Sequence, residues 1–201
     1  MSDHPLATGS RLALLCVALS GCPALDVRQP IALISDGDWT TSEVQILREA
    51  GACWNQEFGT QLLVDPPDGV AQRVEVSYSD FVCTYAGGRT ESTPPVQVRI
   101  CPPRYFFGLS DGASLMLFGV LIHELGHVLN IRDHADEPDS VMARSAEGRS
   151  YDQLFFPDHF SADDHRLFGL ANPGAALAPP CARGVWIRKL TSAPSCSCLS
   201  G

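Results

Sequence analysis

Residues 123–127 have the side chains and the spacing of a hydrolytic metal site. On a helix, residues four apart lie one above the other on the same face, so His123 and His127 can bind one metal ion. Glu124 then lies beside that ion, where its carboxylate can take a proton from a bound water molecule. The alternative is a helix that carries two histidines and a glutamate on its surface without binding a metal.

Two features downstream of this motif favour the metal site. The chain continues to His134 and then to Met142. Together with the motif, this order resembles the metzincin zinc peptidases, in which H-E-x-x-H-x-x-G-x-x-H precedes a methionine turn. The resemblance covers roughly residues 30–170, and its specific part runs from the motif to the methionine. It implies one catalytic zinc ion bound by the motif histidines, Glu124 as general base, and Met142 as an apolar floor below the metal.

The sequence departs from the family pattern at two positions. Asn130 replaces the glycine that ends the helix in a left-handed conformation, and asparagine is the best substitute for glycine there. Strict spacing makes Asp133 the third ligand, whereas the separation from Met142 that the resemblance to matrixin-like sequences implies favours His134, one residue later. We expect His134 to be the third ligand, because imidazole is a common zinc ligand. Asp133 remains the alternative, and the residue that does not bind can orient a ligand from outside.

Alternation of apolar and polar side chains predicts strands before the motif. They are expected at residues 31–34, 61–65, 73–78 and 96–100. Proline pairs bracket the last of these, so we expect it at an edge of the sheet. In metzincins an edge strand forms the upper rim of the cleft and pairs with extended substrate. The alternative is a hairpin strand without a functional role.

Capping patterns predict where two helices begin. Thr40 and Glu43 form a capping box ahead of an apolar stripe, which predicts a helix over residues 41–54. Ser161 followed by acidic residues is typical of an N-cap and predicts a second helix over residues 162–170. His159 and His165 lie in this region, and we expect both to be structural or surface residues.

The motif itself lies in a mostly apolar stretch, residues 113–129. A surface helix would carry more charge, so this helix is expected to be buried. Burial would desolvate Glu124 and raise its affinity for a proton. With these elements, the resemblance implies an α+β fold of the zincin-like (metzincin) type. It would have a twisted mixed sheet packed on a helix, a central active-site helix and a C-terminal helix.

The amino terminus resembles a bacterial lipoprotein signal. Arg11 precedes an apolar run over residues 12–19, which is too short to span a bilayer and is followed by Ser20, Gly21 and Cys22. In lipoproteins the signal peptide is removed before such a cysteine, which is then acylated. Cys22 is therefore the expected lipid attachment site, and the residue after it slightly favours the outer membrane. A plain secretory signal and a secreted protein are the alternative.

These features divide the chain into three segments. We expect a signal peptide over residues 1–21, a catalytic domain over residues 22–172 and a cysteine-containing tail over residues 173–201. Without Cys16 and Cys22, six cysteines remain, and an even number in an exported chain predicts three disulfides. They are Cys53, Cys83, Cys101, Cys181, Cys196 and Cys198. The sequence does not fix their pairing, although Cys83 with Cys101 is favoured because they flank a turn-rich segment.

Composition and motif together predict an exported hydrolase. The 201-residue chain has a net charge of −9 and no basic cluster, so nucleic acid is not an expected partner. We expect a monomeric zinc endopeptidase that cleaves protein or peptide substrates through a zinc-bound water, with a membrane contact only through the lipid anchor. One alternative is a catalytically inactive zinc-binding surface lipoprotein. Another is an interaction module in which the motif is accidental.

Overall fold

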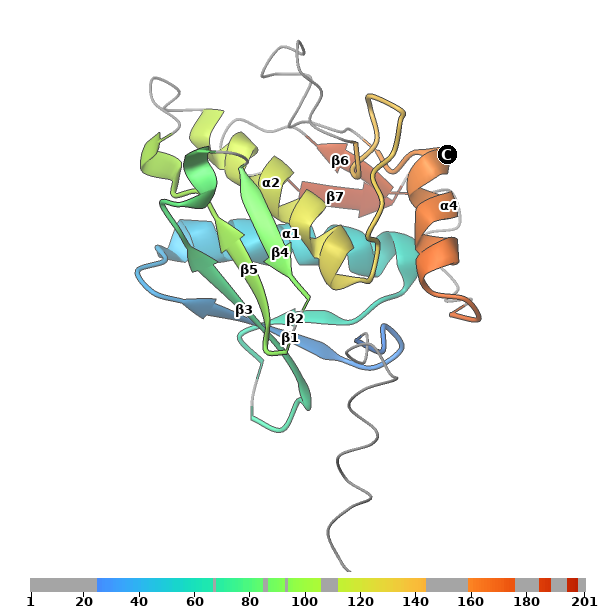
Figure 1. Cartoon of the computed structure of the whole chain (residues 1–201), viewed down its shortest axis with the longest axis horizontal. Coiled ribbons are helices and arrows are strands. Elements are labelled where there is room, and N and C mark those ends of the chain that lie inside the picture. The colour runs from blue at the N-terminus through green and yellow to red at the C-terminus, as the bar shows by residue number, and fades with distance from the viewer. Residues whose placement is uncertain are drawn as a thin grey trace, which may run out of the picture.

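The computed structural model describes residues 25–66, 68–84, 87–92, 94–105, 112–143, 159–175, 185–188 and 195–198. Within these ranges the chain forms a five-stranded mixed sheet, three helices and a separate two-stranded sheet (Figure 1). None of the helices in this part of the chain is long and apolar enough to cross a bilayer. The expected combination of a mixed sheet with packed helices is confirmed.

The main sheet has the strand order β2-β1-β3-β5-β4. Its strands are β1 (Ile31–Asp36), β2 (Leu62–Val64), β3 (Gln72–Tyr78), β4 (Gly88–Glu91) and β5 (Val96–Ile100). The first four in this order are parallel neighbours, and β4 runs antiparallel to β5. The four strands expected from the sequence are confirmed, with ends shifted by at most two residues. Two short 3₁₀ turns, Val82–Thr84 and Pro103–Tyr105, follow β3 and β5.

The expectation that residues 96–100 form an edge strand is wrong. β5 lies between β3 and β4, and β4 takes the edge position (Figure 1). The proline pairs flank β5 without entering it, so its N–H groups remain available to the neighbours on both sides. β4 was not expected, because its four residues are Gly, Arg, Thr and Glu and show no apolar alternation.

One face of the sheet is apolar and carries both long helices. The register aligns Leu33 with Val74 and aligns Val98 with Thr90, which places these four residues on the same face. A Cβ added to Gly51 of the first helix would lie 3.8 Å from Leu33, so that helix lies directly against this face. The residues that point to the other face are largely charged or polar. They include Arg73, Glu75, Gln97 and Arg99.

The first helix, α1 (Thr41–Phe58), begins at the expected capping box. The Thr40 side chain accepts from the backbone N–H of Glu43, and the Glu43 carboxylate accepts from the N–H of Thr40. The helix extends one turn beyond the expected end at residue 54, because the apolar stripe continues to Phe58. It stops at Gly59, whose φ of 67° is the left-handed conformation of a helix C-cap.

The second helix, α2 (Gly112–Val128), carries the motif and packs against α1. Leu121, Ile122 and Leu125 have no exposed surface, which confirms the expected burial of this helix. The indole Nε1 of Trp54 on α1 donates a hydrogen bond of 2.8 Å to the carbonyl of Ile122. This buried bond fixes the position of α2 on α1 at the turn that precedes the motif.

The third helix, α4 (Ala162–Ala171), begins at Ser161 with a second capping box. The expected N-cap is confirmed, and the helix ends one residue later than expected. Phe168 on α4 and Phe160 just before it pack on Phe58 of α1, with ring centroids 4.4 and 5.2 Å from that of Phe58. An aromatic cluster therefore joins the end of α1 to α4.

The carboxyl-terminal part of the chain forms a pair of antiparallel strands, β6 (Val185–Arg188) and β7 (Ser195–Cys198). β7 packs against α1, and a disulfide joins Cys196 to Cys53 in that helix. The favoured pairing of Cys83 with Cys101 is confirmed. Cys198 is also disulfide-bonded, and Cys181 lies outside the described residues.

Removal of the Cys53–Cys196 disulfide should destabilise the fold more than removal of Cys83–Cys101. The sequence separations are 143 and 18 residues, and a longer loop costs the crosslinked unfolded chain more entropy. We expect the paired alanine variants to lower the free energy of unfolding by about 5 and about 3 kcal/mol, respectively. Urea denaturation followed by circular dichroism measures both. If the variant with alanine at Cys53 and Cys196 had the same urea midpoint as the wild type, this would show that β6 and β7 do not unfold together with α1.

Candidate metal centre

Three histidines converge at the end of α2. His123 and His127 lie one turn apart on the helix, and His134 comes from the loop that follows it. One ligand atom from each ring lies within 4.8 Å of those from the other two. The ring centroids are 4.9 to 5.3 Å apart. Such a group of imidazoles surrounds a volume that a single metal ion can occupy.

Hydrogen bonds to the backbone fix how two of these rings are protonated. His123 Nδ1 lies 2.9 Å from the carbonyl oxygen of Val141, and His127 Nδ1 lies 2.6 Å from that of Ile131. A carbonyl oxygen only accepts, so each Nδ1 must carry the proton. The Nε2 atom of each ring therefore keeps its lone pair. This is the tautomer that backbone carbonyls impose on metal-binding histidines.

The surroundings also keep His123 neutral. Burial, together with the charges of the neighbouring imidazoles, lowers its pKa to about 3. A neutral ring is the form that binds a metal, because protonation of both nitrogens removes the lone pair. His123 is therefore ready to bind a metal at any pH near neutrality.

A single left-handed residue returns the chain to this site. Asn130 has a φ of 68°, which confirms the conformation expected at the glycine position of the pattern. The N–H of Ile131 donates to the carbonyl of Gly126, and the N–H of Asn130 donates to that of His127. These two bonds form a Schellman motif, which ends α2 and reverses the chain. His134 follows four residues later.

The asparagine side chain does what a glycine could not do. Its Nδ2 donates to the carbonyl of Leu25 at 2.9 Å and to Oδ1 of Asn172 at 3.0 Å. Asn172 in turn donates to the carbonyls of Leu129 and Phe168. These bonds offset the cost of a left-handed non-glycine residue, since they join the turn to the start of the described chain and to the end of α4.

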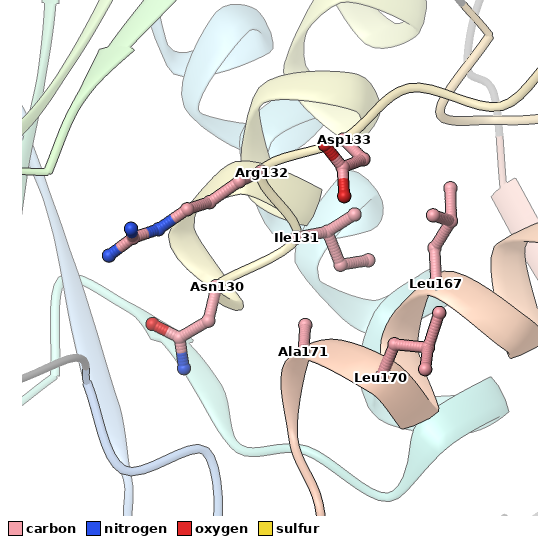
Figure 2. A pocket seen from close by; sticks show the side chains of 7 residues that line it. All are labelled: Asn130, Ile131, Arg132, Asp133, Leu167, Leu170 and Ala171. Carbon is pink, nitrogen blue, oxygen red and sulfur yellow. The ribbon is translucent and has the colours of Figure 1, made fainter.

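Asp133 lies away from the three histidines. It lines a pocket between this loop and α4, together with Ile131, Leu167 and Ala171 (Figure 2). In Figure 2 its carboxylate points toward that pocket. Asp133 does not belong to the group whose ligand atoms converge, whereas His134 does. Of the two alternatives for the third ligand, the structure brings His134 to the site.

Met142 lies directly below the motif and has no exposed surface. A Cβ at Gly126 would overlap its Sδ atom and would lie 3.0 Å from Cζ2 of Trp54. The glycine between the two motif histidines therefore allows the methionine to approach the helix backbone. Met142 thus forms an apolar contact with the turn of α2 that carries the two motif histidines.

The sequence did not identify the residue that holds the methionine turn. Asp164, fully buried on α4, accepts hydrogen bonds from the hydroxyl of Ser140 and from the N–H groups of Val141 at 3.0 Å and Met142 at 2.9 Å. Since the carbonyl of Val141 accepts from His123, Asp164 supports that ring through one residue. Sequence patterns indicated Asp164 only as an acidic residue in the first turn of a helix.

Glu124 is 5% exposed, and its carboxylate lies beside β4. Burial raises its pKa, as expected, and a hydrogen bond from Thr90 opposes the shift. The Thr90 hydroxyl donates to Oε2 of Glu124 at 2.7 Å. Thr90 was missed because β4 itself was not expected.

The remaining candidate residues do not join this centre. His165 on α4 forms an ion pair of 2.7 Å with Glu57 and packs on Phe58. His159 is exposed, so neither histidine is placed as a ligand. Cys22 and residues 144–158 lie outside the described residues.

Similarity to known proteins does not identify this centre. No protein-family model matches the chain, and comparison with curated proteins also gives no match. What the site can do must therefore follow from its own contacts and from the chemistry of its side chains.

Asp164→Asn should destabilise the fold and weaken metal binding. The asparagine amide would direct an NH₂ group at donors that now bond to a carboxylate. We expect the free energy of unfolding to fall by about 3 kcal/mol, because several hydrogen bonds to a buried charge are lost. Urea denaturation measures the stability, and competition with a chromogenic chelator measures the zinc affinity.

Asp163→Asn is the matched control for this variant. Asp163 pairs with Arg166, whose side chain is 55% exposed, and such pairs contribute only about 0.5 kcal/mol. Equal losses of stability in the two variants would contradict the role given to Asp164.

Proposed function

We propose that this protein is a zinc-dependent endopeptidase with a zincin-like domain of the metzincin type, similar to the matrixins. The observation that carries the proposal is the convergence of His123, His127 and His134 beside a buried glutamate. The methionine below the motif supports the same assignment. A surface helix with an accidental motif would not combine these contacts.

The donor set fits a catalytic zinc ion better than a structural one. Structural zinc sites have four protein ligands, whereas catalytic sites have three and keep one position open. Within the described ranges, the group of possible ligands around these histidines has three members. This count favours an enzyme over the alternative of an inactive zinc-binding surface protein.

In the proposed reaction the zinc ion and Glu124 have different roles. When bound, zinc would polarise the scissile carbonyl and lower the pKa of a water molecule to roughly 7. Glu124 then takes the proton of the attacking water and passes it to the leaving amine. Its burial suits both steps, because a carboxylate with a raised pKa holds a proton long enough to donate it.

An extended peptide is the substrate that the edge of the sheet would accommodate. β4 pairs with β5 on one side, and no described strand pairs with its other side. The backbone groups on the side that no described strand occupies can add a further strand, and β4 contacts α2, which carries Glu124. Residues 96–100 were expected to form the upper rim of the cleft. We now assign this role to residues 88–91.

We propose that the protein works outside the cytoplasm as a monomer. The disulfides agree with an oxidising compartment. The lipoprotein-like sequence that ends at Cys22 favours a lipid anchor in the bacterial envelope, in the outer membrane rather than the inner one. Its substrates would be extracellular or envelope proteins, and its membrane contact would be the anchor alone.

Glu124→Gln should abolish most peptide hydrolysis while zinc remains bound. The substitution leaves all three histidines in place and removes only the proton acceptor, which contributes about 10²- to 10⁴-fold to the rate. The digestion of a peptide library, followed by mass spectrometry, measures activity, and elemental analysis measures zinc. Glu57→Gln, at the other glutamate that is buried in the described part of the chain, is the control and should cleave like the wild type. Full activity of Glu124→Gln would refute the assignment of the base.

His134→Ala and Asp133→Ala should differ in metal content. His134 belongs to the converging group, whereas Asp133 faces the pocket near α4. We expect His134→Ala to lose bound zinc and Asp133→Ala to retain one ion per chain. Elemental analysis of the purified variants after dialysis measures both. The opposite pattern would show that the carboxylate is the third ligand.

A further inference from the structure

We propose that Gly88 and Thr90 of β4 are positioning residues that hold the carboxylate of Glu124 in its working orientation. This inference rests on the proposed function, because it concerns the residue assigned there as general base. The two residues lie two apart on one strand, so they face the same side of the sheet. That side is the one on which α2 packs.

Thr90 holds one oxygen of the carboxylate. Its Oγ1 lies 2.7 Å from Oε2 of Glu124 and 3.2 Å from the backbone carbonyl of the same residue. Both groups accept, and the single hydroxyl proton favours the nearer carboxylate oxygen, with the backbone carbonyl of Glu124 as the more distant acceptor. Threonine is stiff about χ1, so its hydroxyl moves little once the backbone is fixed.

Gly88 makes room for the other part of the side chain. A Cβ added there would lie 2.7 Å from Cγ and 2.9 Å from Oε1 of Glu124, and 2.8 Å from Cγ1 of Val120. These distances are shorter than real contacts of a Cβ atom. The Glu124 side chain thus occupies the space that any larger residue at this position would fill.

The core of the domain fixes these two positions. Gly88 is paired with Ile100 and Thr90 with Val98, and both partners have no exposed surface. Movement of either residue would require β4 to shift against a packed strand. Gly88 and Thr90 therefore form a rigid support for Glu124, which we call the cradle. The cradle restricts the Glu124 carboxylate to one orientation toward the substrate.

Orientation is decisive for a general base, because a group displaced by about 1 Å can lose up to a hundredfold in rate. Thr90→Val keeps the shape of the side chain and removes the hydroxyl. We expect kcat to fall about tenfold or more with KM within about twofold, while zinc content stays unchanged. Thr90→Ser keeps the hydroxyl and should restore most of kcat. Gly88→Ala should lower kcat by pushing the carboxylate aside.

A second measurement does not depend on activity. In a double-mutant cycle on the metal-free protein, Thr90→Val and Glu124→Ala should be non-additive in the urea midpoint, because each removes the same hydrogen bond. Thr60 is the matched control, since it is buried and its hydroxyl bonds to Asn55 instead. Thr60→Val and Glu124→Ala should be additive.

The two measurements separate this inference from the proposed function. If the wild type cleaves peptides, wild-type kcat in Thr90→Val together with additive midpoints would overturn the role of β4 and leave the peptidase intact. If the wild type cleaves nothing, the peptidase proposal fails, and the cycle alone decides: additive midpoints would overturn the cradle, and non-additive midpoints would support it.

Discussion

The reversal of the chain at Asn130 is the constraint on which the site depends. α2 supplies His123 and His127 on one face, and the third imidazole, His134, comes from the segment that turns back immediately after the helix. The left-handed residue and the two Schellman hydrogen bonds make this turn within one residue. The side chain of Asn130 then ties the turn to Leu25 and Asn172, which lie far away in the sequence. The geometry of the three histidines is therefore a property of the whole domain.

Contacts between residues that are distant in the sequence also hold the side chains below and beside the histidines. Asp164, on α4, holds the turn that places Met142 under α2 and Val141 against His123. β4 supports Glu124 from the opposite side. The charged and polar groups of the site are thus held from three directions by buried or partly buried hydrogen bonds. Such bonds are strong because few water molecules compete for them.

Much of the fold could be predicted from local patterns. The capping boxes at Thr40 and Ser161 start their helices as expected, because these bonds involve residues only three apart. The left-handed turn at Asn130 was predicted from the resemblance to the metzincins, in which a glycine ends the helix at this position. β4 was not predicted, since a four-residue strand with a glycine and two charges forms only through its pairing with β5. The edge position assigned to residues 96–100 failed because proline pairs mark the ends of a strand and say nothing about its neighbours.

The site residues likewise divide into those that local sequence patterns identify and those that depend on the tertiary structure. Spacing alone identified His123, Glu124 and His127, but the choice between Asp133 and His134 required the path of the loop. The roles of Asp164 and Thr90 at the site could not be predicted from the sequence, because the partners that define these roles, Met142 and Glu124, are 22 and 34 residues away. X-ray absorption spectroscopy of the zinc-loaded protein tests the central claim most directly. Three imidazole nitrogens and one light ligand at about 2.0–2.1 Å would support it, whereas sulfur at about 2.3 Å or a first shell with fewer than three imidazoles would contradict it.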